Sequence, residues 1–146
     1  MRKLYDLFLE STAMSWSDYF KEYKSCGRKV QSIFQNEIYS LISLELFVVT
    51  LMSLAFYYLY LNNRFGRYYS NKTWFSFLFL NGLLIGVITY LSAKSALADV
   101  SCSVGGQLGW ISVINFLLAL ILFTLLSFVF RLGSAMGKHT PYFTTN

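Results

Sequence analysis

The sequence predicts an all-α integral membrane protein with three transmembrane helices preceded by an N-terminal amphipathic helix. The 146 residues are 55% hydrophobic and only 13% charged, whereas about 25% of the residues in soluble domains are charged. The apolar residues gather into three segments, each close to the roughly 20 residues that a helix needs to cross a bilayer. The tail before them repeats apolar residues at helical spacing. This composition excludes an ordinary soluble domain.

We place the three spans at residues 39–61, 74–93 and 108–130. The alternative is a soluble protein with three buried helices, but residues 1–38 and two short loops do not supply the polar faces that such helices need. The chain then divides into an N-terminal interfacial region (1–38), a three-span membrane domain (39–130) and a short basic C-terminal tail (131–146).

Residues 4–24 form the predicted amphipathic helix. A helical wheel gathers aromatic and aliphatic residues on one face, Trp16 among them, and charged residues on the other. An apolar face with tryptophan is typical of helices that lie in the membrane interface. Packing of this face on the protein's own spans or on a neighbouring protein is the alternative. Apolar residues continue at helical spacing from Val30 to Ile38, which predicts a helix continuous with the first span.

Basic and aromatic residues mix around the first loop, where the expected partners are anionic lipid headgroups. The same mixture also occurs on single-stranded nucleic-acid surfaces, but a short loop held between two spans is a poor platform for nucleic acid. We therefore expect lipid contact and no nucleic-acid binding. The residues assigned to the headgroup layer, with Trp16 of the N-terminal helix, are Arg64, Arg67, Tyr68, Tyr69, Lys72 and Trp74.

Three spans place the N-terminal tail and the second loop on one side of the membrane. Slightly more basic residues flank the spans on the other side, which favours a cytoplasmic first loop and C-terminus. The export of a long charged tail argues against that orientation. Cys26 and Cys102 share the N-terminal side, where they form a disulfide if that side is oxidising and remain two thiols if it is cytosolic.

Glu45 is the one charged residue within the predicted spans. A carboxylate deep in the hydrocarbon layer costs about 2.5 to 3.5 kcal/mol, so it needs a partner or contact with water. Antiparallel spans bring Thr89, Lys94 and Asn115 to a similar depth, and we expect Glu45 to pair with Lys94, with Asn115 as a hydrogen-bond partner. The alternatives are a Glu45 side chain that reaches the interface and a proton or ion pathway.

The second span contains Asn81, Gly82 and Gly86. Glycines four residues apart share a helix face and allow another backbone to approach closely, and an asparagine beside them can hydrogen-bond across the contact. These residues predict a close helix contact, either within the monomer or between copies of the chain.

Residues that carry chemistry are scarce. The single histidine, His139, lies in the tail. No cysteine, histidine or acidic cluster has metal-ligand spacing, and no nucleotide-binding or hydrolase motif is present. We therefore expect no cofactor, no metal and no catalysis.

The expected function is that of a non-catalytic subunit, anchor or scaffold in a membrane-associated assembly. Its expected partners are membrane lipids and other membrane protein subunits, or further copies of itself. The alternative is a homo-oligomeric pore or membrane-perturbing effector that passes ions or protons past Glu45, Asn81 and Asn115.

Overall fold

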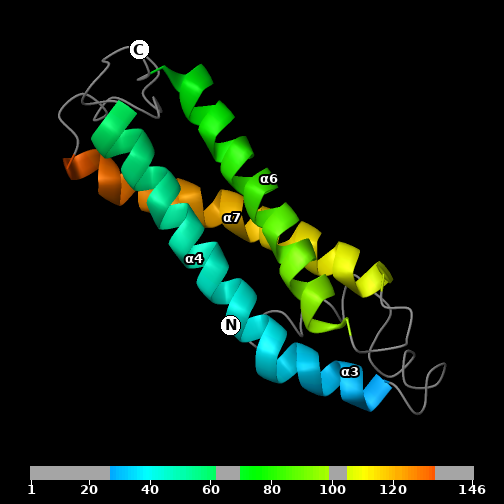
Figure 1. Cartoon of the computed structure of the whole chain (residues 1–146). Helices are drawn as coiled ribbons and strands as arrows, with labels where there is room; N and C mark the ends of the chain where they lie inside the picture. Colours follow the sequence, from blue (N-terminus) through cyan, green and yellow to red (C-terminus); the bar gives the residue numbers. More distant parts are fainter. Residues whose placement is uncertain (1–26, 62–69, 99–104, 134–146) are drawn as a thin grey trace.

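The computed structural model describes residues 27–61, 70–98 and 105–133, and within these ranges every regular element is a helix. The first long helix runs without a break through α3 (Gly27–Ile33), the π-helical turn η1 (Phe34–Ile38), α4 (Tyr39–Ala55) and the π-helical turn η2 (Phe56–Leu61). The second is α6 (Asn71–Ala96) and the third is α7 (Gly105–Gly133). Figure 1 shows α4 and α6 next to each other, with α7 crossing behind them. The amphipathic helix predicted at residues 4–24 lies outside the described residues.

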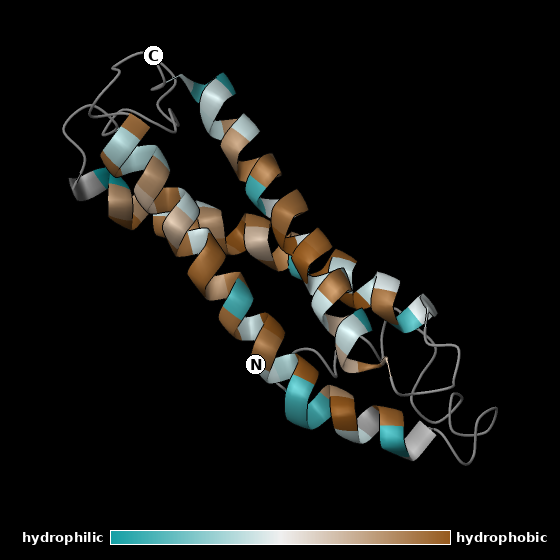
Figure 2. Ribbon diagram, in the orientation of Figure 1, coloured by the Kyte–Doolittle hydropathy of each residue, from teal (hydrophilic) through white to brown (hydrophobic). Residues whose placement is uncertain are grey.

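In the part of the chain that the structure describes, three helices are long and apolar enough to cross a membrane: Phe34–Leu61, Asn71–Ala96 and Gly105–Arg131. The predicted all-α fold with three spans is therefore confirmed, and the chain is a multi-pass membrane protein. Each helix extends beyond its predicted span, since hydropathy marks only the apolar part of a helix and not its polar ends. Figure 2 shows apolar residues along the full length of the bundle, including its outer faces.

Local sequence explains where α6 begins. Ser70 precedes the helix in an extended conformation, and its Oγ accepts a hydrogen bond from the backbone N–H of Thr73 at 3.3 Å. Such a cap satisfies one of the donors that the first turn leaves free. Lys94 and Arg131 lie in the last turns of α6 and α7, where a positive charge complements the helix dipole.

The two π-helical turns adjust the buried face of the first helix. Ile42, Leu46, Thr50 and Leu54 are buried at intervals of four residues, which is the stripe expected of a helix packed on one side. In η2 the consecutive residues Tyr57 and Tyr58 are both fully buried. A π-helical turn accommodates one more residue than an α-helical turn, so both tyrosine rings face the other helices.

Three clusters of buried residues follow one another along the bundle. At one end, Phe34 and Ile38 pack near Ala93 and Ile111. In the middle, one residue from each long helix meets: Leu46, Ile85 and Ala119. At the other end, the cluster is aromatic and comprises Leu54, Tyr57, Tyr58, Trp74 and Phe123. Because the end of α4, the start of α6 and the later part of α7 meet there, consecutive helices are antiparallel.

Candidate functional site

The candidate site is the set of polar side chains inside the bundle. Asn81, Ile85 and Thr89 of α6 are buried at intervals of four residues, so they lie on one face of that helix. Among the described residues, the other buried polar side chains are Thr50 of α4 and Asn115 and Ser127 of α7. All of these polar side chains except Asn81 form a hydrogen bond.

Glu45 bonds across the bundle to a serine. The Oγ atom of Ser92 on α6 donates a hydrogen bond of 2.6 Å to Oε1 of Glu45 on α4. The other carboxyl oxygen, Oε2, is buried and has no hydrogen-bond partner. This contact links α4 to α6 near one end of the bundle.

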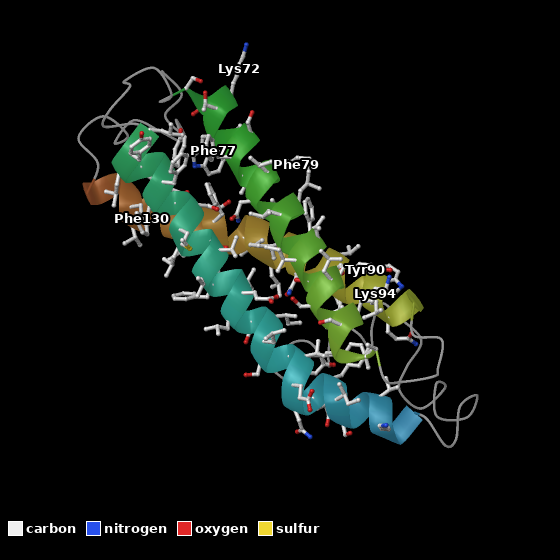
Figure 3. The ribbon with its side chains drawn as sticks, in the orientation of Figure 1. Lys72, Phe77, Phe79, Tyr90, Lys94 and Phe130 are labelled. Carbon is white, nitrogen blue, oxygen red and sulfur yellow. The ribbon has the colours of Figure 1, made fainter. Side chains whose placement is uncertain are left out.

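The expected pair between Glu45 and Lys94 is not formed. Lys94 is exposed near the end of α6 (Figure 3), and Ser92 takes the position next to the carboxylate. The reason is geometric: two residues along an α-helix correspond to a rotation of about 200°. If Ser92 faces α4, Lys94 faces away from it. Sequence reasoning missed Ser92, although it lies three residues after Thr89 and therefore on the same face.

Asn115 and Thr89, which depth alone placed near Glu45, are joined to each other. Nδ2 of Asn115 donates a hydrogen bond of 2.9 Å to Oγ1 of Thr89, and both side chains are completely buried. This bond links α7 to α6 one helical turn away from the Glu45–Ser92 contact. Thr50 is equally buried, but its hydroxyl donates to the backbone carbonyl of Leu46 in its own helix at 2.7 Å.

Trp74 differs from the prediction that it faces lipid headgroups. It is buried in the aromatic end of the bundle, where its indole Nε1 donates a hydrogen bond of 3.2 Å to Oγ of Ser127. A buried indole needs such a partner for its N–H group, and sequence reasoning did not single out Ser127. Tyr58 is fully buried in the same cluster. Lys72, in contrast, is exposed and extends away from the bundle in Figure 3.

Gly82 and Gly86 face α7 within the same chain. A Cβ atom placed on Gly82 would lie 3.0 Å from side-chain atoms of Phe116 and Leu120. A Cβ atom on Gly86 would lie 3.6 Å from the backbone carbonyl oxygen of Ser112. The glycine pair therefore serves a close contact between α6 and α7 in the monomer.

Asn81 has neither a donor nor an acceptor partner. Its side chain is buried, with 2% of its surface exposed, yet Nδ2 and Oδ1 both lack hydrogen bonds. Asn81 lines a groove of about 410 Å³ between the first long helix and α6. The other residues of the groove, which are apolar except for one serine, are Val49, Met52, Ser53, Phe56, Phe77, Leu80 and Leu84.

Several predicted residues lie outside the described part of the chain. They are Trp16, Arg64, Arg67, Tyr68 and Tyr69 of the predicted lipid contacts, and Cys26 and Cys102 of the possible disulfide. Lipid binding by the first loop and the disulfide therefore stay predictions. Among the described residues, no group of histidine, cysteine and acidic side chains is arranged to hold a metal ion.

Comparison with known proteins finds no relative of this chain. No family model, no curated protein and no solved structure matches this chain.

Proposed function

We propose that this chain is a non-catalytic integral membrane protein that acts as a subunit, anchor or scaffold in a membrane-associated assembly. The observation that carries the proposal is the Asn81 amide, which is buried in an outward-opening apolar groove without a hydrogen-bond partner. An unsatisfied polar group in a hydrocarbon environment costs several kcal/mol. A partner that enters the groove from outside the bundle relieves that cost.

The remaining interior polar groups support the same proposal because they bond mainly to one another. Glu45–Ser92 links α4 to α6, and Asn115–Thr89 and Trp74–Ser127 link α6 to α7. Hydrogen bonds between membrane helices contribute roughly 0.6 to 2 kcal/mol each. Assembly of the bundle accounts for these residues without a substrate.

The proposal is tested by extraction of the chain from its native membrane into lipid nanodiscs, followed by measurement of the mass and composition of the particle. We expect other polypeptides in a fixed ratio to the chain. We also expect Asn81→Leu to change the mass or the composition of the particle. Recovery of single copies of the chain with lipid alone, for both the wild type and Asn81→Leu, would contradict the proposed function.

A second candidate is a pore or proton pathway past Glu45, Asn81 and Asn115, and it is favoured by the unpartnered Oε2 atom of Glu45. Such a pathway predicts that vesicles containing the protein lose a proton gradient, and that Glu45→Gln abolishes the loss. The layer formed by Leu46, Ile85 and Ala119 argues for the first proposal. Its apolar side chains separate the level of Thr89 from that of Asn81, and no polar side chain bridges that gap along α6.

A further inference from the structure

The groove that Asn81 lines requires an occupant with a polar group at the depth of Asn81. Asn81 is the eleventh of the 26 residues of α6, which places it about 4 Å from the helix midpoint at 1.5 Å per residue. The polar groups of phospholipids begin about 15 Å from the centre of a bilayer whose hydrocarbon core is roughly 30 Å thick. Acyl chains in the groove would leave the amide unsatisfied.

A second copy of the chain supplies the missing group at the correct depth. Copies inserted with the same topology hold Asn81 at the same level of the membrane. A carboxamide carries both a donor and an acceptor, and in Asn81 both are unpartnered. Both amide atoms are buried within the monomer. Once the side chains turn from that position into the groove, two Asn81 amides related by a two-fold axis can satisfy each other, because such an interface pairs each surface with its own copy.

The sequence of α6 fits this arrangement. A seam of residues spaced alternately by four and three runs along the helix: Phe77, Asn81, Leu84, Ile88 and Leu91. This is the spacing of a two-stranded coiled coil, in which a single asparagine in the seam sets register and the number of chains. The first three residues of the seam line the groove. Leu84 and Leu91 are exposed in the monomer, at 48% and 58%.

We propose that the groove between α4 and α6 binds a second copy of the chain, α6 against α6 in parallel, with the two Asn81 amides hydrogen-bonded across the two-fold axis. The inference rests on the proposed function and deepens it, since it names one partner of the groove. Glu45, Thr89 and Asn115 stay inside each monomer and take no part in the contact.

The first experiment is cysteine crosslinking of the full chain in lipid vesicles, in a background where Cys26 and Cys102 are serine. Leu84→Cys lies on the seam and should form a covalent dimer. Ile121→Cys is the control, because it is similarly exposed at 57% and lies two residues from Ala119, which packs on Ile85 at a similar depth. We expect no dimer for the control. Equal crosslinking of both variants, or crosslinking of Ile121→Cys alone, would overturn the proposal.

The second experiment measures association by energy transfer between labelled copies as the lipid-to-protein ratio is raised. Asn81→Leu should weaken association about tenfold, since hydrogen bonds between membrane helices reach roughly 1 to 2 kcal/mol and 1.4 kcal/mol corresponds to a factor of ten. Asn81→Gln keeps an amide and should retain part of the association. Thr124→Val is the control, because that hydroxyl already bonds the Leu120 carbonyl at 2.8 Å in its own helix.

A merely structural role for Asn81 gives a different result. Asn81→Leu removes a buried amide that has no partner in the monomer, so the monomer should unfold no more easily than the wild type. A wild-type chain that is monomeric at every ratio, or an Asn81→Leu variant that associates as well as the wild type, would refute the paired amides. If that happens while native particles still contain other polypeptides, the proposed function stands and only the second copy is excluded.

Discussion

The buried hydrogen bond between Asn115 and Thr89 should stabilise the bundle measurably, and replacement of Thr89 by valine tests this. Valine has nearly the shape of threonine, so Thr89→Val removes the Oγ1 acceptor that lies 2.9 Å from Nδ2 of Asn115 without opening a cavity. Both side chains are completely buried. Loss of a hydrogen-bond partner at a buried group costs about 1 to 3 kcal/mol, and bonds between membrane helices average about 0.6 kcal/mol. We expect the free energy of unfolding to fall by about 1 to 2 kcal/mol.

The same helix bundle provides a matched control, Thr50→Val. Thr50 is also completely buried, but its hydroxyl donates to the Leu46 carbonyl in its own helix, so valine leaves no group on another helix without its bond. We expect a smaller loss than for Thr89→Val, because the Leu46 carbonyl still accepts the backbone hydrogen bond of its helix. The assay is reversible unfolding in mixed micelles, followed by circular dichroism. Equal destabilisation by the two variants would show that loss of the hydroxyl itself, and not loss of the interhelical bond, determines the result.

Three further predictions use the same unfolding assay. Gly82→Leu should destabilise the bundle by about 1 to 3 kcal/mol, because even a Cβ atom there lies 3.0 Å from side-chain atoms of α7. Gly86→Ala should be tolerated, because its Cβ atom would lie 3.6 Å from the nearest atom, which is an ordinary van der Waals contact. Ser92→Ala should destabilise the bundle more than Lys94→Ala, since Ser92 donates a hydrogen bond to Glu45 and Lys94 is exposed. A larger destabilisation by Lys94→Ala would instead support the Glu45–Lys94 pair. Trp74→Phe should cost about 1 kcal/mol, because it removes the indole N–H that bonds a buried serine; an unchanged midpoint would place the indole outside the bundle.

Hydropathy was enough to predict the number of membrane helices but not their ends. The three spans follow from long apolar segments, whose length is set by the bilayer and depends little on how the helices pack. The ends depend on single contacts at the boundary. Ser70 caps α6, which begins at Asn71, three residues before its predicted start. The first helix begins at Gly27, and its continuation into the span at residue 39 agrees with the helical spacing predicted from Val30 to Ile38. The capping residue Ser70 lies in polar sequence, where hydropathy carries no signal.

The sequence predicted how deep the polar residues lie in the membrane but not which neighbouring helix each of them faces. Counting residues along antiparallel helices brought Thr89 and Asn115 to one level, and the structure joins them by a hydrogen bond. Depth says nothing about which face of a helix a residue occupies, and for that reason Lys94 was expected where Ser92 lies. Trp74 shows the same limit, since its position near a helix end fits an interfacial residue and also fits a buried one whose N–H group finds a partner.

Asn81, which has no hydrogen-bond partner inside the monomer, is the polar residue that is most informative about function. On α6, the side that faces the groove lies next to the side that packs on α4, and Asn81 lies at the boundary between the two. Asn81 is buried like Ile85, yet it lines the groove together with the exposed Leu84. An asparagine that served only the bundle would be expected to bond a neighbour, as Asn115 does. The absence of such a bond in the described residues, together with the coiled-coil spacing around Asn81, favours a partner outside the monomer over a structural role within it.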